Sequence, residues 1–367
     1  MTLLAVVLFL ALFVVLYPRV VESLYGPRPT PDEVHFVTTS DGWRLALHRY
    51  RPRGDDPNGE PVLLHHGLGG TAKNFDLGVG TPDAPAPSLA HWLADRGYDV
   101  WVCDLRGRGA SEHPTLGNGK RWDWSLDDFI EKDDPAFVDY ILARAGHANL
   151  HWIGLSMGGI LLLCHCAREG SPKVASGVAA GSGLDYAGTG SGYESLIRWT
   201  GLTRVLKRVP TGLIARLQAP FCGRRGSGVG AFNFYPANIA PRAARAIEGG
   251  SLEDVPGALL KQMATLFAPG GLTSMDGRVR YVERAANVTT PILMLAGEKD
   301  LQSSPALADR TRGVLPGDAH KVVKFGRSYG HPEHYGHIDL VAGLRADTET
   351  FPEMLAWLKA HPASRRA

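Results

Sequence analysis

The chain begins with 17 residues that contain no charged side chain. This apolar run, Met1–Tyr17, ends at Pro18 and Arg19. A run of this length is close to the minimum that a membrane-spanning helix needs. A cleaved signal peptide usually has a basic residue before its apolar core and small residues at a cleavage site, and the chain has neither; a buried helix is a third possibility. We therefore predict an uncleaved membrane anchor over residues 1–22, and Arg19 favours the cytoplasmic face for the rest of the chain.

A different pattern follows a short proline-rich linker. Residues 34–39 and 43–50 alternate apolar and polar positions around Ser40-Asp41-Gly42, which predicts a β-hairpin. Short, unbroken apolar runs then alternate with helical segments, a pattern typical of parallel strands that are covered on both faces. The predicted strands of this sheet are 62–64, 100–103, 150–155, 174–180, 291–296 and 322–325. The fold class is therefore α/β, with a mostly parallel sheet and helices on both faces.

The segment 187–288 interrupts this alternation. It has no comparable apolar strand, and its apolar residues recur at helical spacing within 196–206, 243–247 and 259–267. We interpret it as a helical cap inserted between the sixth and seventh strands. The cap is basic, and its arginines could contact an anionic membrane or simply face solvent. The predicted division is an anchor at 1–22, a core at 23–186 and 289–367, and a cap at 187–288.

One stretch in the middle of the chain carries a chemical motif. Gly154-Leu155-Ser156-Met157-Gly158 lies between an apolar strand and an apolar helix. In the G-x-S-x-G pattern a nucleophilic serine occupies a strained turn from strand to helix, and the glycines stand where backbone approaches closely. The helix after Ser156 directs its first N–H groups towards a developing oxyanion. We expect Ser156 to be the nucleophile and the Met157 N–H to be one of two oxyanion donors.

A serine nucleophile needs a histidine that takes its proton and a carboxylate that orients this histidine. With this motif, the acid is expected after a late strand and the histidine near the end of the chain. Asp300 comes just after the predicted strand 291–296 and is the predicted acid. Glu298 and Asp185 stay open as alternatives.

Three histidines follow the last predicted strand: His331, His334 and His337. Their even spacing could indicate metal ligands, but an extended loop gives them no reason to converge and the sequence offers no fourth ligand. His337 directly precedes an apolar segment that can anchor its loop, so we predict it as the catalytic base. The sequence indicates no metal and no cofactor.

The second oxyanion donor is expected in the glycine-rich loop after the strand at 62–64, and we assign it to the Leu68 N–H. His66, Gly67 and Leu155 are predicted to contribute to substrate binding. The segment 104–111, which follows the next strand, is interpreted as a structural brace of its loop.

Composition narrows the range of partners. The net charge of +2 excludes the strongly basic balance of a nucleic-acid-binding protein. The 4 cysteines form no metal-like spacing and argue against a disulfide framework. A hydrophobic fraction of 44% is typical of a globular protein with a substantial core.

Several segments together resemble the acid lipase family of gastric and lysosomal lipases. They are 66–68, 93–101, 122–136, 150–159, 297–301 and 337–339. The resemblance implies the α/β-hydrolase fold and a triad of Ser156, Asp300 and His337 that hydrolyses triacylglycerols or cholesteryl esters. This family usually has His and Gln beside the serine, where this chain has Leu155 and Met157, and the cap has no match.

The sequence therefore predicts an α/β-hydrolase fold with a helical cap after the sixth strand and an N-terminal membrane helix. The expected function is hydrolysis of carboxylic esters, above all lipid esters, through an acyl-enzyme on Ser156. Acyl transfer or thioester hydrolysis on the same triad, and a non-catalytic scaffold at a membrane, are the alternatives. The expected partners are the ester substrate and a membrane, and no nucleic acid.

Overall fold

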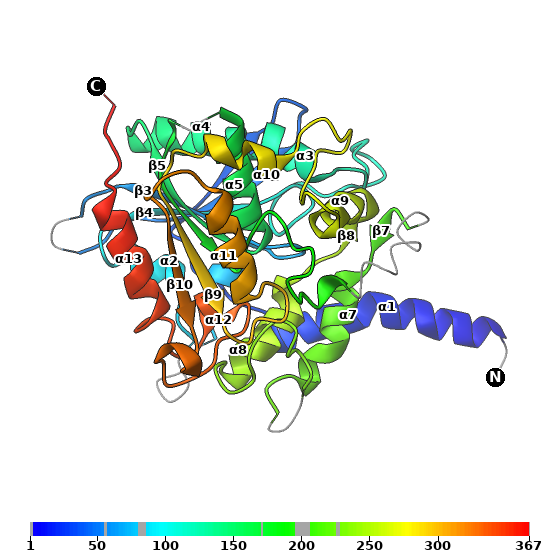
Figure 1. Ribbon diagram of the computed structural model, residues 1–367. Coiled ribbons are helices and arrows are strands. Elements are labelled where there is room, and N and C mark those ends of the chain that lie inside the picture. Colours follow the sequence, from blue (N-terminus) through cyan, green and yellow to red (C-terminus); the bar gives the residue numbers. More distant parts are fainter. Residues whose placement is uncertain are drawn as a thin grey trace.

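A computed structural model describes residues 3–54, 57–79, 86–169, 172–194, 206–224 and 228–366. An 8-stranded sheet with the order β1-β2-β4-β3-β5-β6-β9-β10 forms its centre (Figure 1). The pairs β1·β2 and β2·β4 are antiparallel, and the other neighbours are parallel. The strands are β1 (Glu33–Thr38), β2 (Arg44–Tyr50), β3 (Pro61–His65), β4 (Asp99–Asp104), β5 (Leu150–Leu155), β6 (Val174–Ala180), β9 (Ile292–Gly297) and β10 (Lys321–Phe325). The predicted hairpin and strands are confirmed.

Helices cover both faces of the sheet (Figure 1). One face carries α4 (Asp134–Ala145), α5 (Met157–Glu169) and α11 (Pro305–Val314). The other face carries α2 (Leu89–Ala94), α12 (Asp339–Ala342) and α13 (Thr350–Ala360). Every residue of β3, β4, β5 and β9 is buried. Burial on both faces explains why these strands are unbroken apolar runs rather than alternating ones.

The insertion between β6 and β9 is largely helical, with one short antiparallel pair of strands, β7·β8. Its main elements are β7 (Arg208–Val209), α7 (Thr211–Gln218), η4 (Ala219–Phe221), α8 (Pro241–Ala246), η5 (Ile247–Ser251), β8 (Val255–Pro256), α9 (Gly257–Met263), η6 (Ala264–Phe267), α10 (Tyr281–Arg284) and η7 (Ala285–Asn287). The predicted helical segments at 243–247 and 259–267 are confirmed. The one at 196–206 falls almost entirely on residues 195–205, which lie outside the described part of the chain.

Short helical turns complete the structure. They are η1 (Ala72–Phe75), α3 (Leu126–Asp128), η2 (Phe129–Asp133) and η8 (Arg327–Tyr329). All four lie in the connections between strands of the sheet or directly after β10.

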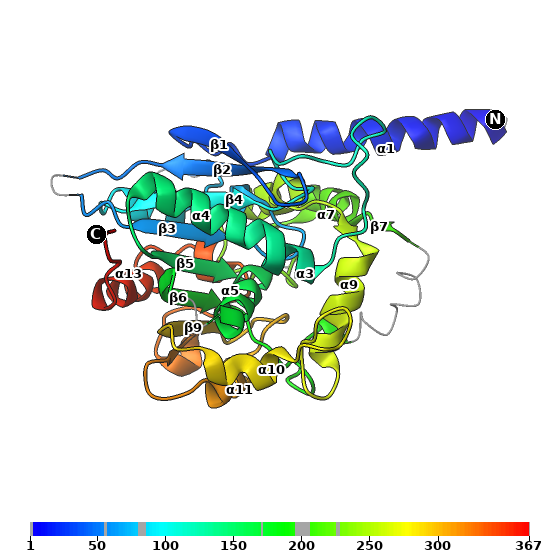
Figure 2. The ribbon, with the colours of Figure 1, turned by 90° about the horizontal axis from the view of Figure 1, so that it is seen from above.

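The N-terminal segment forms one long helix, α1 (Leu3–Tyr25), whose N-terminal end extends away from the body (Figure 2). The C-terminal half of this helix is held by the protein. The Tyr17 hydroxyl donates a hydrogen bond to the Arg216 carbonyl (3.3 Å), and Glu22 forms ion pairs with Lys73 (2.8 Å) and Arg216 (3.3 Å). These contacts fix α1 to the cap and to the loop after β3.

The predicted membrane-spanning anchor over 1–22 is not supported. Among the helices of the described residues, none is both long enough and apolar enough to cross a membrane. The helix does not stop where the apolar run ends, because it continues through Pro18, Arg19 and Glu22 to Tyr25. Polar contacts with the body, rather than a break in the helix, follow the apolar run.

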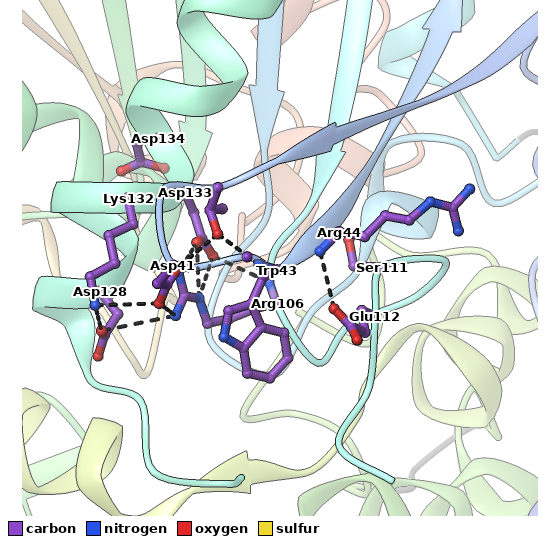
Figure 3. Close-up of polar contacts among 12 residues, drawn as sticks. Asp41, Trp43, Arg44, Arg106, Ser111, Glu112, Asp128, Lys132, Asp133 and Asp134 are labelled. Atoms are coloured by element: carbon purple, nitrogen blue, oxygen red, sulfur yellow. Dashed lines mark hydrogen bonds and ion pairs between the residues drawn. The ribbon is translucent and has the colours of Figure 1, made fainter. Parts of the chain in front are cut away.

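The loop after β4 is braced by a buried network of charges (Figure 3). The Arg106 guanidinium donates to Asp41 in the β1–β2 turn (2.8 Å) and to Asp133 before α4 (2.9 Å). Lys132 forms ion pairs with Asp128 (2.8 Å) and Asp41 (3.3 Å) at the edge of this network. The segment 104–111 is therefore structural, as predicted, because Arg106 ties a hairpin turn to the start of a helix on the sheet.

Candidate active site

Ser156 lies in the turn between β5 and α5. Its φ is 55°, and it is the only residue other than glycine with a positive φ in the described ranges. A Cβ atom at Gly154 would lie 2.2 Å from the Gly158 carbonyl carbon, so the turn tolerates no side chain there. Strain at a single non-glycine residue is a frequent feature of functional sites. The predicted strained turn is confirmed, and Ser156 remains half-buried at its apex.

Asp300 and His337 form a buried pair. The Nδ1 atom of His337 lies 2.7 Å from Oδ2 of Asp300, and both side chains are at most 3% exposed. The other carboxylate oxygen accepts hydrogen bonds from the N–H groups of Gln302 (2.7 Å) and Ser303 (2.8 Å). In this arrangement the Nδ1–H group of His337 donates the hydrogen bond to Asp300, which leaves Nε2 as the basic atom of the ring. Nε2 is buried and has no hydrogen-bond partner in the described structure.

The end of β6 brings Ser156 and this pair to one place. The Ser156 N–H donates to the Ala180 carbonyl at 2.8 Å. A Cβ atom on the next residue, Gly181, would lie 2.9 Å from His337 Nδ1 and 3.1 Å from Asp300 Oδ2. The three predicted triad residues therefore lie on two sides of one short stretch of backbone. They meet at the carboxyl ends of β5, β6 and β9, where sites in parallel sheets are built.

The alternative acids have other partners. Glu298 accepts a hydrogen bond from the Ser328 hydroxyl (2.7 Å) and lies 2.9 Å from His334 Nδ1. Hydrogen bonds lower the pKa of Glu298 to about 2: those from Ser328 contribute most, and the bond to His334 contributes less. Asp185 accepts the N–H of Ala187 (3.1 Å) and pairs with Arg310 (3.4 Å). Neither carboxylate is bonded to His337.

The three late histidines do not converge. His331 accepts a hydrogen bond from the Gly326 N–H at 3.4 Å, and its ring packs at a tilt against Phe325. His334 instead bonds to Glu298, and His337 bonds to Asp300. In the part of the chain that is described, no group of His, Cys, Asp and Glu side chains is arranged to hold a metal ion.

The glycine-rich loop after β3 lies against the serine. A Cβ atom at Gly67 would lie 2.9 Å from Ser156 Cβ and 3.5 Å from its Oγ. A turn closed by the Gly70 N–H and the Gly67 carbonyl (3.0 Å) includes Leu68. Neither the Leu68 N–H nor the Met157 N–H donates a hydrogen bond within the described residues. Both are therefore available beside Ser156, where an oxyanion would form.

His66 and Leu155 lie behind the site. The His66 ring is fully buried, its Nδ1 is 2.9 Å from the Gly67 carbonyl, and its Nε2 accepts the Leu105 N–H at 3.3 Å. Burial is the largest cause, and the neighbouring His65 the second, that lowers the pKa of His66 to about 3. The ring is therefore neutral. Leu155 is the last residue of β5, and its side chain is buried in the core on the face of the sheet that carries α2, α12 and α13. We assign His66 to support of the glycine-rich loop rather than to substrate contact.

The sequence did not point to Asn233, a cap residue that joins both catalytic loops. Its carbonyl accepts the Ile338 N–H at 2.8 Å, and its Oδ1 accepts a hydrogen bond from Gln302 Nε2 at 2.9 Å. Its Nδ2 donates to Glu248 Oε1 at 2.7 Å. Asn233 therefore links the loop of Asp300, the loop of His337 and a buried cap carboxyl group. No local sequence signal identifies it.

Asp339 shapes the histidine loop from the other side. Its Oδ2 accepts the N–H groups of Gly336 (2.7 Å) and of the cap residue Tyr235 (3.0 Å). Asp339 is fully buried, which raises the pKa of its carboxyl group well above the usual range. The sequence places this acid two residues after His337, and that proximity was the one available signal of its role.

Two sequence families match the chain. One, described as the alpha/beta hydrolase fold, matches residues 60–194, and the other, a partial α/β-hydrolase lipase region, matches residues 29–78. Lipase 1 of Drosophila melanogaster is 36% identical over 161 residues, 42% of this chain and 35% of that protein. Gastric triacylglycerol lipase of Bos taurus is 38% identical over 135 residues, 35% of this chain and 33% of that protein. The chain thus spans about a third of the length of these relatives.

Solved structures resemble nearly the whole chain. An esterase from Thermogutta terrifontis matches with a TM-score of 0.59 at 18% identity, covering 90% of this chain and 100% of that one. A monoacylglycerol lipase from Paleococcus ferrophilus matches with a TM-score of 0.57 at 19% identity, covering 87% and 99%. Such low identities establish the fold alone. The chain therefore has the α/β-hydrolase fold, and over the matched part of its sequence it resembles the acid lipases.

Proposed function

We propose that the chain is a serine hydrolase of carboxylic esters, with lipid esters as its substrate class. The observation that carries this proposal is the buried hydrogen bond of 2.7 Å between Asp300 and His337, beside the strained Ser156. The similarity to lipases supports the preference for lipid esters.

In the proposed mechanism, Ser156 Oγ attacks the ester carbonyl and its proton passes to His337 Nε2. Asp300 holds the Nδ1 proton and stabilises the imidazolium that forms. The Leu68 and Met157 N–H groups donate to the oxyanion. The alcohol leaves with the proton from Nε2, and water activated by His337 then releases the acyl group from Ser156 as a carboxylic acid.

Attachment to a membrane is part of the same proposal. The exposed apolar residues of α1, among them Leu12, Val14 and Val15, support it, because exposed apolar surface of this extent marks an interaction site. The cytoplasmic face is favoured by Arg19, on the C-terminal side of the apolar run.

The test is labelling with a fluorophosphonate probe, followed by hydrolysis of p-nitrophenyl esters of increasing chain length. We expect the probe to label the parent protein and not the Ser156→Ala variant. We also expect turnover by the parent protein to rise as the acyl chain becomes longer. Ser328→Ala, a serine on the loop after β10, is the matched control and should label normally. Activity on short chains alone would remove the lipid preference, and an unlabelled but folded parent protein would overturn the catalytic assignment. Acyl transfer to an added alcohol or release of a thiol from a thioester, measured with the same protein, distinguishes the other reactions of this triad.

A further inference from the structure

Exposed apolar side chains follow one side of α1 from Phe13 to its C-terminal end, and near Phe13 the neighbouring Leu12, Val14 and Val15 are exposed as well. Phe13, Leu16, Val20 and Leu24 are spaced by three, four and four positions, which places them on one side of a helix. Their exposed fractions lie between 36% and 67%. We call these four residues the apolar stripe. Val21, which faces the body, is only 3% exposed, so the helix packs on the protein through this side while the apolar stripe stays partly exposed to solvent.

The apolar stripe ends at a cavity. This cavity has a volume of about 450 Å³ and lies between the end of α1, the segment that follows it, and α8. It is lined by Leu24, Tyr25, Gly26, Arg28, Gly78, Val79, Arg242 and Arg245. Leu24 belongs both to the stripe and to the cavity wall, so the two features are continuous. The volume is in the range of small-molecule sites.

The positive charge of this arginine cavity has no counter-charge among the described residues that line it. These residues include three arginines and no acidic residue. Arg28 and Arg242 are exposed, and within the described ranges their side chains make no hydrogen bond or ion pair; Arg245 donates one hydrogen bond, to the Cys222 carbonyl at 3.3 Å. Glu22, the acid at this end of α1, is already paired with other residues. Guanidinium groups recognise phosphate through paired N–H donors.

Apolar surface continues beside α1 on the cap. Ile214 and Leu217 on α7 and Phe221 on η4 are between 40% and 50% exposed. The hydrogen bond from Tyr17 to the Arg216 carbonyl holds α7 against α1, and the two helices lie on the same side of the molecule in Figure 2. A ligand that complements this surface therefore needs apolar groups as well as an anionic group.

We propose that the arginine cavity binds the phosphate group of an anionic membrane lipid while the apolar stripe lies among the acyl chains. This inference rests on the membrane attachment proposed above, and it adds the class of lipid that the protein binds. Because the stripe runs along the helix axis, α1 would lie along the membrane surface, which brings the cavity at its end to the level of the headgroups. A free phosphate ion would pair with the arginines but would leave the stripe exposed to water, so the pattern favours a lipid.

The test is co-sedimentation of the full-length protein with vesicles of phosphatidylcholine, with or without about a third of phosphatidylglycerol. The cavity variant is Arg28→Gln/Arg242→Gln. The matched control is Arg284→Gln/Arg366→Gln, which removes the same charge from two exposed residues, one in α10 and one near the C-terminus. Both α10 and the C-terminal end lie at the opposite end of the molecule from α8 (Figure 1). We expect the parent protein to bind anionic vesicles more tightly than neutral ones. The affinity of the cavity variant for anionic vesicles should be about tenfold lower than that of the parent protein. The affinity of the control for anionic vesicles should fall by less than about twofold. Binding to vesicles of phosphatidylcholine alone should be the same in the parent protein and in both variants.

Two results would overturn the inference: no preference of the parent protein for anionic vesicles, or equal losses in the cavity variant and its control. Inorganic phosphate distinguishes the two sources of the anion: if the parent protein binds it in solution, loses this binding in the cavity variant and shows no preference for anionic vesicles, the cavity is a site for free phosphate and not for a lipid. Leu16→Ser/Val20→Ser tests the attachment separately, because it should weaken binding to both kinds of vesicle. Unchanged hydrolysis of a short p-nitrophenyl ester in solution, with an unchanged circular dichroism spectrum, shows that each variant is folded.

Discussion

Two acid–histidine pairs lie close together on the loops that follow β9 and β10. Asp300 bonds to His337 at 2.7 Å, and Glu298 bonds to His334 at 2.9 Å. The chemical groups and the distances are nearly the same, but the surroundings differ. The first pair is at most 3% exposed and lies against Gly181, whereas the side chains of the second are 15% and 18% exposed and are capped by Ser328.

The difference shows that an acid–histidine hydrogen bond is not by itself a sign of catalysis. Asp300 is held by two further N–H donors and faces the backbone next to Ser156, so its histidine is oriented with respect to a nucleophile. Glu298 and His334 instead close the loop around Ser328, and we interpret them as structural. The four predictions below separate these two roles.

The largest effect is expected from the two histidines. His337→Ala removes the proposed base, and we expect kcat/KM for a soluble p-nitrophenyl ester to fall by at least about 10⁴-fold. His334→Ala is the matched control and should change kcat/KM by less than about threefold, because its ring is hydrogen-bonded to Glu298 and lies edge-on to Tyr235. Steady-state kinetics of both variants check this. A large loss in His334→Ala with little loss in His337→Ala would reverse the two roles.

The two acids provide the second test. Asp300→Asn keeps the size of the side chain but removes the charge that stabilises the imidazolium and fixes its tautomer, so we expect a loss of about 10³-fold in kcat. Glu298→Gln makes the same chemical change in the other pair and should leave kcat within about twofold. The readouts are kcat and the rate of fluorophosphonate labelling. Comparable losses in both variants would mean that the two pairs act together.

The third test concerns the cap residue that holds the buried pair. Asn233→Ala removes the side-chain hydrogen bonds to Gln302 and Glu248 but keeps the carbonyl that accepts the Ile338 N–H. We expect kcat to fall by about tenfold, because the loop of Asp300 loses its side-chain support from the cap. Glu248→Gln retains an acceptor for the Asn233 amide and should keep most of the activity. The rate of active-site labelling and the KM distinguish misplaced catalytic groups from weaker substrate binding. An effect on KM alone would place Asn233 in substrate binding instead.

The smallest effect is expected on stability. The bonds to Ser328 and His334 lower the folded-state pKa of Glu298 to about 2, below its usual value of 4.5. Because the pKa is depressed in the folded state, the pair stabilises the fold above about pH 4.5, and this stabilisation is lost as the pH falls towards 2. Glu298→Gln should therefore lower the free energy of unfolding at pH 7 by less than about 1 kcal/mol, since the pair contacts solvent. Urea unfolding at several pH values should show that the difference between variant and parent shrinks with acidification; a constant difference would contradict it.

Much of the core could be predicted because its signals are local. The strands around the site are apolar runs buried on both faces, and the turn at Ser156 depends on glycines only two positions away. The candidate acid and base could be reduced to a few residues, because each follows a strand that the sequence also reveals. The choice among His331, His334 and His337 rested on a weaker argument, the apolar segment after His337.

The contacts that hold the site depend on tertiary structure. Asn233 and Gln302 are 69 positions apart, and Tyr235 and Asp339 are 104 apart, so no periodicity links them. The same applies to the arginine cavity, whose residues come from the end of α1, the segment that follows it, the loop after β3 and α8. The membrane-spanning anchor was predicted from the apolar run alone, whereas the contacts of Tyr17 and Glu22 with the cap join residues almost 200 positions apart.

The sequence by itself determined the order of the strands along the chain, the strained serine turn and the short list of acids and histidines. These features follow from side-chain polarity and backbone sterics over a few residues. The tertiary structure decided which acid and which histidine share a buried hydrogen bond beside Ser156, and how the cap supports them. That decision requires distant loops to meet at the carboxyl ends of neighbouring strands, and only the packed sheet brings them together.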